Sequence, residues 1–135
     1  MKVLDLFSGI GGFSLGLERA GMETVAFCEI DPKCRLVLKK HWPDIPVYED
    51  VREINASRLF SDGIERPDVI CGGFPCQDIS VAGPGEGING ERSGIWKEFK
   101  RLIKDLGPNY AIIEHVANLR NNGLVTVLQD IWEIG

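Results

Sequence analysis

Long apolar runs and an excess of basic residues are both missing from this 135-residue sequence. No apolar stretch approaches the roughly 20 residues that cross a bilayer, and Asp5 interrupts the apolar start that a secretion signal would need. These absences argue against a membrane protein and make the cytoplasm the expected location. The formal net charge of −5 argues against a chain that grips nucleic acid unaided, because contacts with phosphate dominate such binding.

Cysteine and histidine are scarce, with four and two copies. No two cysteines have the C-x-x-C spacing, and His41 and His115 belong to no ligand pattern. We therefore expect neither a metal site nor a disulfide framework. Both histidines are interpreted as structural, and Cys28, Cys34 and Cys71 as small buried side chains.

Short apolar runs alternate with helical stretches along the chain, without a repeat or a linker. This alternation predicts one α/β domain over residues 1–135, with a parallel sheet of about five strands and helices on both faces. The expected strands are residues 2–7, 24–29, 46–49, 68–71 and 110–113. The expected helices are residues 12–20, a helix capped by Asp31 and Pro32 that stops before Pro43, one from Ser93 to residue 106, and a last one from residue 124.

The helix expected from Ser93 has two different faces. Its inward face is expected to carry Trp96, Phe99, Ile103 and Leu106. Its opposite face carries Lys97, Lys100, Arg101 and Lys104. We favour a solvated face over a contact surface for DNA.

A glycine-rich turn at residues 9–12 follows the first expected strand and opens a helix. Glycine lets the backbone turn sharply and approach a ligand, and a helix N-terminus can receive an anion. Glu29 ends the second strand, 20 residues after Gly9, where it could accept hydrogen bonds from ribose hydroxyls. Asp50 could accept one from an adenine amino group. The spacing differs from the G-x-G-x-x-G of dinucleotide enzymes, which weakens a nicotinamide interpretation; a plain tight turn with solvated acids is the other alternative.

Cys76 lies beyond the fourth expected strand, in a Gly- and Pro-containing loop of residues 72–92. Loops of that length in a compact domain are typical of lids and binding sites, and a thiolate is a strong nucleophile near neutral pH. Glu114 ends the fifth strand after an apolar run that would favour its protonated form, so it could donate a proton in the same cleft. A solvated strand-end acid is the alternative for Glu114. The two groups together suggest covalent catalysis on an electrophilic ring beside an adenosine site.

Four segments resemble, in order and spacing, the motifs of the DNA cytosine C-5 methyltransferases. Asp5–Ser14 resembles their first motif, and Gly72–Ser80 resembles their Pro-Cys-Gln motif. Arg92–Phe99 resembles the segment after their mobile loop, and Glu114–Val116 resembles their Glu-Asn-Val motif. The resemblance extends over essentially the whole chain.

This resemblance implies a Rossmann-like, S-adenosylmethionine-dependent methyltransferase fold that acts on double-stranded DNA. Cys76 would attack ring carbon 6 of a flipped cytosine while Glu114 acts on ring nitrogen 3, and Pro75 would shape the loop. S-adenosylmethionine would be the cofactor. The implied cofactor-binding residues are Phe7, Ser8, Gly9, Gly11, Glu29, Ile30, Asp50, Val51 and Phe74.

Two features depart from the family pattern. His115 stands where the family has an Asn that braces the active-site loop. The sequence also stops at Gly135, before the further strands and the target-recognition domain of the family. It therefore predicts a truncated fold, and we expect the main contacts with DNA to come from those further segments. We expect the apolar strand 110–113 to be a sheet edge that binds a second copy or a complementing chain. The alternative function is an inactive S-adenosylmethionine-binding fragment that needs such a chain.

Overall fold

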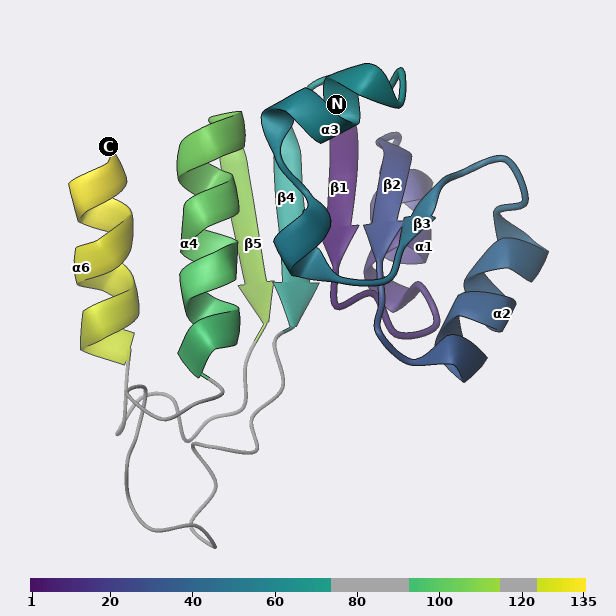
Figure 1. Cartoon of the computed structure of the whole chain (residues 1–135), viewed down its shortest axis with the longest axis horizontal. Helices are drawn as coiled ribbons and strands as arrows, with labels where there is room; N and C mark the ends of the chain where they lie inside the picture. The colour runs from purple at the N-terminus through teal and green to yellow at the C-terminus, as the bar shows by residue number, and fades with distance from the viewer. Residues whose placement is uncertain (74–92, 115–123) are drawn as a thin grey trace, which may run out of the picture.

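The computed structural model describes residues 1–73, 93–114 and 124–135 (Figure 1). Within these ranges the strands form one sheet in the order β3-β2-β1-β4-β5, and every neighbouring pair is parallel. This arrangement confirms the predicted Rossmann-like sheet. The strands are β1 (Lys2–Leu6), β2 (Glu23–Cys28), β3 (Val47–Tyr48), β4 (Val69–Gly73) and β5 (Tyr110–Glu114).

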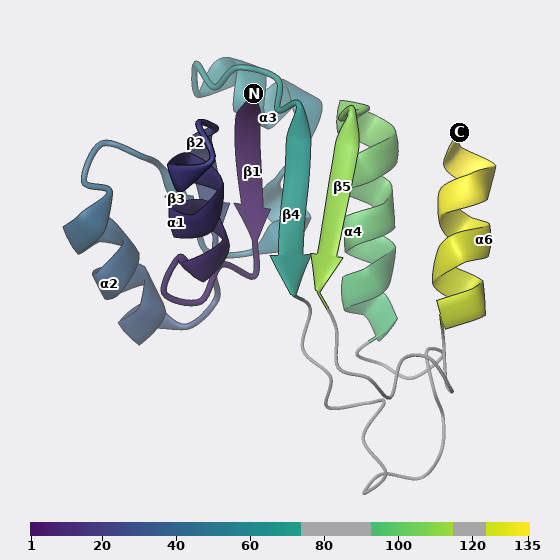
Figure 2. The same ribbon diagram turned by 180° about the vertical axis from the view of Figure 1, so that it is seen from behind.

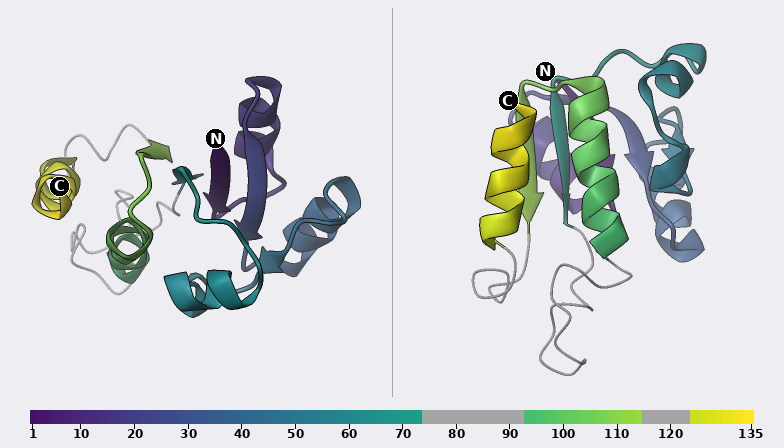
Figure 3. Two further views of the ribbon diagram at one scale, coloured as in Figure 1. Left: turned by 90° about the horizontal axis from the view of Figure 1, so that it is seen from above. Right: turned by 60° about the vertical axis from the view of Figure 1, so that its left-hand side comes forward.

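Helices cover both faces of the sheet. Seen from above, α1 lies on one face and α3 and α4 lie on the other (Figure 3), and α6 lies beyond β5 next to α4 (Figure 2). No helix in the described ranges is long and apolar enough to cross a membrane. The helices are α1 (Gly12–Arg19), α2 (Pro32–His41), the 3-10 helix η1 (Val51–Glu53), α3 (Ala56–Ser61), α4 (Ser93–Leu106) and α6 (Leu124–Ile134).

The predicted cap of α2 is present, because Asp31 accepts a hydrogen bond from the backbone of Lys33 and Pro32 begins the helix. The sequence analysis missed η1 and α3, which are also capped by side chains: Asp50 caps η1 and Asn55 caps α3. Each of these short helices buries a single apolar side chain. One buried residue produces no apolar period, so neither helix has the pattern of an amphipathic helix.

The core lies on both sides of β1. Val3 of β1 packs in a smaller cluster with Val69 and Cys71, against which Phe13 and Leu17 of α1 are placed. The larger cluster, on the α4 side, contains Leu4, Leu6, Ile70, Trp96, Phe99, Leu102 and Leu106. The prediction for α4 needs one correction, because Leu102 is fully buried whereas Ile103 is half-buried.

The basic face of α4 is only partly solvated. Lys100 Nζ lies 2.5 Å from Asp130 Oδ1 of α6, and Trp96 Nε1 donates to the other oxygen of that carboxylate at 2.7 Å. Arg101 pairs with Glu98 at 2.6 Å and donates to the backbone oxygen of Val51 at 3.1 Å. The prediction of a solvated basic face is therefore wrong for two of its four residues. Lys100 joins α4 to α6, and Arg101 joins α4 to η1.

Asp5 is the one acidic residue of β1, and it is fully buried. Ser14 of α1 donates to its Oδ2 at 2.7 Å, while its Oδ1 has no hydrogen-bond partner among the described residues. Burial raises the pKa of Asp5 from 3.8 to about 6, because the charged form loses its hydration.

This raised pKa predicts a stability that falls with pH. The stabilising contribution of protonated Asp5 is complete below its unfolded pKa and is lost as the pH rises through the folded value. The difference between 3.8 and about 6 corresponds to roughly 3 kcal/mol. We expect urea denaturation to show that the free energy of unfolding of Asp5→Asn, measured relative to the wild type, rises by about that amount from about pH 3 to about pH 7. Parallel pH curves for the two proteins would contradict the prediction.

Candidate functional site

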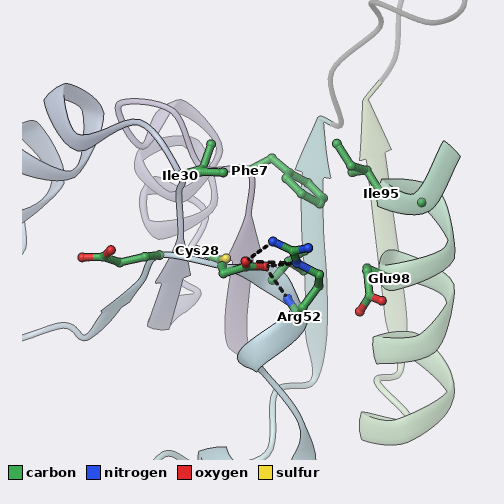
Figure 4. A pocket seen from close by; sticks show the side chains of 10 residues that line it. Phe7, Cys28, Ile30, Arg52, Ile95 and Glu98 are labelled. Carbon is green, nitrogen blue, oxygen red and sulfur yellow. Dashed lines mark hydrogen bonds and ion pairs between the residues drawn. The ribbon is translucent and has the colours of Figure 1, made fainter. Parts of the chain in front are cut away.

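A pocket of about 340 Å³ opens at the carboxyl ends of the strands (Figure 4). Ligands of open parallel sheets bind at this edge, and the volume suits a small organic molecule. Four of the predicted cofactor-binding residues line it, namely Phe7, Ile30, Asp50 and Val51. The sequence analysis did not assign the other lining residues, which are Cys28, Glu49, Arg52, Gly94, Ile95 and Glu98.

The glycine turn after β1 is held by an aromatic ring from another element. Gly11 is the N-cap of α1 and has a φ of 90°, which few residues other than glycine adopt. A Cβ atom at Gly11 would lie only 2.6 Å from the ring of Trp42. Trp42 Nε1 in turn donates to the Glu18 carboxylate of α1 at 3.0 Å. Trp42 follows the end of α2, so it fixes where α1 begins relative to α2, and no local pattern predicted this.

Glu29 joins the glycine turn to the end of β2. Its carboxylate is buried and accepts from the backbone N–H of Gly9 at 2.7 Å and of Asp31 at 2.8 Å. Ser8 makes a second link, because its backbone N–H donates to the backbone oxygen of Cys28 at 3.0 Å. Ser8, Gly9, Gly11 and Glu29 are therefore next to the pocket without lining it.

Phe7 closes one side of the pocket in a strained conformation. Its φ of 55° is in the left-handed region, where a non-glycine residue costs about 1 kcal/mol or more. The ring lies 6.3 Å from that of Phe99 on α4 and is nearly parallel to it. Contacts with a helix on the same face of the sheet thus hold the side chain at the pocket wall.

Asp50 supplies the main acceptor of the pocket. It caps η1 through the backbone N–H of Arg52 at 2.9 Å, and the Arg52 side chain pairs with the same carboxylate. Hydrogen bonds from Arg52 lower the pKa of Asp50, so this group is anionic near neutral pH. The pocket combines apolar side chains with carboxylates, among them Asp50, and this combination suits a purine ring and its amino group.

Of the predicted catalytic residues, only Glu114 lies within the described ranges. Phe74, Pro75, Cys76 and His115 lie outside them. Glu114 ends β5 in register with Gly73 of β4, and its side chain is exposed. The sequence analysis expected apolar surroundings for Glu114, and this expectation is wrong for the described residues. The two residues before it, at this edge of the sheet, are themselves only half-buried. Its predicted role remains a prediction.

Fold and pocket together define a Rossmann-like domain with a pocket at the carboxyl ends of its strands. In the part of the chain that the structure describes, no group of three His, Cys, Asp or Glu side chains could bind a metal ion. The domain also matches the model of the C-5 cytosine-specific DNA methylases over residues 1–134. The chain belongs to this family.

Two curated relatives illustrate the match. The chain is 42% identical over 120 residues to the Type II methyltransferase M2.BsuMI of Bacillus subtilis, covering 86% of this chain and 29% of that protein. It is 38% identical over 133 residues to the Type II methyltransferase M.Eco47II of Escherichia coli, covering 98% and 31%. The chain thus spans about a third of the length of these relatives.

Solved structures show the same fold. A prophage-encoded Escherichia coli protein described as a DNA modification methyltransferase superposes with a TM-score of 0.79 at 28% identity, over 99% of this chain and 37% of that one. A mutant of Spodoptera frugiperda DNMT2 superposes with a TM-score of 0.73 at 22% identity, over 98% and 41%.

Two adjacent glycines at the end of β4 are predicted to respond differently to an added methyl group. A Cβ atom at Gly72 would collide with the backbone oxygen of Leu6 in β1, whereas one at Gly73 would meet the carboxylate end of Glu114 at 2.6 Å. Backbone in the centre of a sheet cannot retreat, but the end of an exposed side chain can. We expect Gly72→Ala to lower the free energy of unfolding by about 3 kcal/mol and Gly73→Ala by less than about 1 kcal/mol. A crystal structure of Gly73→Ala should show the Glu114 carboxylate displaced, and equal losses in urea denaturation would contradict the prediction.

Proposed function

We propose that this chain is the cofactor-binding and catalytic portion of a DNA cytosine C-5 methyltransferase. The observation that carries the proposal is the pocket at the carboxyl ends of the strands, into which the first, second and third strands each deliver a residue that the family resemblance implied for cofactor binding. Membership of the C-5 cytosine-specific family supports this function over a nicotinamide-dependent oxidoreductase. The cytoplasmic location expected from the sequence remains a prediction.

S-adenosylmethionine fits the groups that are present. Phe7, Ile30 and Val51 would enclose the adenine, and Asp50 would accept a hydrogen bond from its amino group. Each Glu29 oxygen accepts one backbone N–H and keeps further acceptor capacity for a ribose hydroxyl. Because α1 has no side-chain cap, its first turn can offer N–H groups to the carboxylate of the methionine moiety. When bound, the cofactor supplies an electrophilic methyl group.

The chemistry proposed for the protein concerns Cys76 and Glu114. The Cys76 thiolate would add to carbon 6 of a flipped cytosine, while Glu114 holds ring nitrogen 3 and offsets the charge that develops there. The ring electrons then make carbon 5 nucleophilic toward the methyl group. Once the methyl group is on carbon 5 and S-adenosylhomocysteine is left, loss of the carbon-5 proton to a base from solvent would expel the Cys76 thiolate and restore the aromatic ring.

A second candidate is a chain that binds S-adenosylmethionine without catalysing transfer. His115 favours it, because imidazole differs in size and donor geometry from the Asn that the family uses at this position.

Covalent trapping separates the two candidates. Double-stranded DNA in which 5-fluorocytosine replaces every cytosine would be incubated with S-adenosylmethionine and the chain, alone and with a polypeptide covering the rest of a relative's length. Fluorine cannot leave carbon 5 as a cation, so a competent enzyme stays bonded to the DNA through Cys76. We expect a stable adduct by denaturing electrophoresis and mass spectrometry, and none for Cys76→Ser. Absence of an adduct under both conditions would leave only the non-catalytic candidate.

We further propose that the β5 edge of the sheet binds a polypeptide equivalent to the rest of the relatives' length. Within the described residues β5 pairs with β4 alone, and an unpaired strand edge can pair with another strand. Large apolar side chains are exposed around it. These are Tyr110 on β5 and Val125, Leu128 and Trp132 on α6, at 60%, 66%, 57% and 87% exposure.

An exposed apolar edge of this kind predicts association in solution. We expect native mass spectrometry of the chain by itself to show dimers or larger species that grow with concentration. The single change Trp132→Glu should reduce them, since it places a charge on the exposed face of α6. Arg19→Glu, on the far helix α1, is the control. A strict monomer at high concentration would contradict this prediction of self-association.

A further inference from the structure

The ion pair between Asp50 and Arg52 lies inside the pocket. Asp50 Oδ1 accepts from the backbone N–H of Arg52 and from its Nε, both at 2.9 Å. Asp50 Oδ2 accepts from the same Nε at 3.0 Å and from Nη2 at 2.5 Å. Both residues line the pocket, so this pair occupies space and hydrogen-bonding capacity that a ligand would use.

The acceptor capacity of Asp50 is filled by this arrangement. An ionised carboxylate has about four acceptor positions, and the contacts with Arg52 number four. A purine amino group that approaches Asp50 therefore meets an occupied carboxylate. The backbone contact belongs to the cap of η1 and can remain. Among the described residues the guanidinium donates hydrogen bonds to this carboxylate alone, and the Arg52 side chain is 73% exposed.

A second carboxylate lines the same pocket. The pKa of Arg52 is raised mainly by its hydrogen bonds with Asp50, and the charges of Glu98 on α4 and of Glu53 on η1 add to this effect. Figure 4 shows Arg52 lying between Cys28 and Glu98. Glu98 also pairs with Arg101 at 2.6 Å, which holds its carboxylate in place on α4. An arginine that leaves Asp50 thus finds a fixed anion on the opposite wall.

We propose that Arg52 is an affinity-determining latch, which covers Asp50 in the free pocket and moves toward Glu98 when an adenosine ligand binds. The proposal rests on the proposed function, since it concerns the adenine end of that pocket. In physical terms, the Arg52 guanidinium and the adenine amino group compete for the Asp50 carboxylate. Moving Arg52 to Glu98 would also join η1 to α4 across the ligand.

Calorimetric titration with S-adenosylhomocysteine tests the latch. An exposed ion pair is worth about 0.2–1 kcal/mol, which is a factor of about 1.4 to 5 in affinity. Arg52→Ala removes the pair with Asp50 from the free state and the weaker contact with Glu98 from the bound state, so binding should tighten, by at most about fivefold. Arg58→Ala is the matched control, because Arg58 also pairs with a nearby carboxylate, Asp62 at 2.8 Å, and does not line the pocket. Unchanged or weaker binding by Arg52→Ala would overturn the proposal.

Two further titrations sharpen the test. Glu98→Gln should weaken binding about twofold in the wild-type background and have no effect in Arg52→Ala, because the Arg52 side chain that Glu98 would receive is then missing. Equal effects in both backgrounds would count against the latch. S-inosylhomocysteine, which lacks the amino group, should gain nothing from Arg52→Ala, and an equal gain for both ligands would also overturn it. Failure of the wild-type protein to bind S-adenosylhomocysteine at all would instead refute the proposed function.

Discussion

The parallel pairing of β1 with β2 on one side and β4 on the other is the constraint on which the site depends. β1 is central, and Val3, Leu4 and Leu6 are completely buried. Because all the strands run in the same direction, the segments that follow them emerge at one edge of the sheet. Phe7 and the residues after β2 and β3 meet there in one pocket, although they are far apart in the sequence. The same pairing brings the end of β4 so close to β1 that Gly72 has no room for a side chain.

Two buried carboxylates show how the chain holds the glycine turn in place. Glu29 accepts two backbone N–H groups, one from Gly9 in the glycine turn and one from Asp31 at the start of α2, and so satisfies donors that would otherwise be unpaired. Asp5 accepts from Ser14 and ties β1 to α1, at the cost of a raised pKa. Trp42 adds a steric constraint from α2. The turn is thus shaped by contacts within the protein, which reduces the ordering that a ligand would have to impose.

Much of the fold could be predicted from the sequence, since its strands are short apolar runs and α2 begins at Asp31 and Pro32, a recognisable capping pattern. The misses have specific causes. Leu102 rather than Ile103 is fully buried in α4, because the choice between adjacent positions depends on how the helix is rotated against the sheet. Two of the α4 cations, Lys100 and Arg101, are paired rather than solvated, because their partners lie on or beside other elements. Helix α3 is too short to have an apolar period.

The sequence by itself determined the order of the family motifs, the parallel α/β architecture and the types of residue at the end of each strand. These features depend on local propensity and on spacing along the chain. Only the tertiary structure decided which side chains share the pocket, that Glu29 serves the glycine turn, and that Arg52 occupies the carboxylate expected to meet the adenine. The reason is that a carboxylate pairs with whichever donor the fold brings within about 3 Å. That proximity is set by the packing of whole helices and strands.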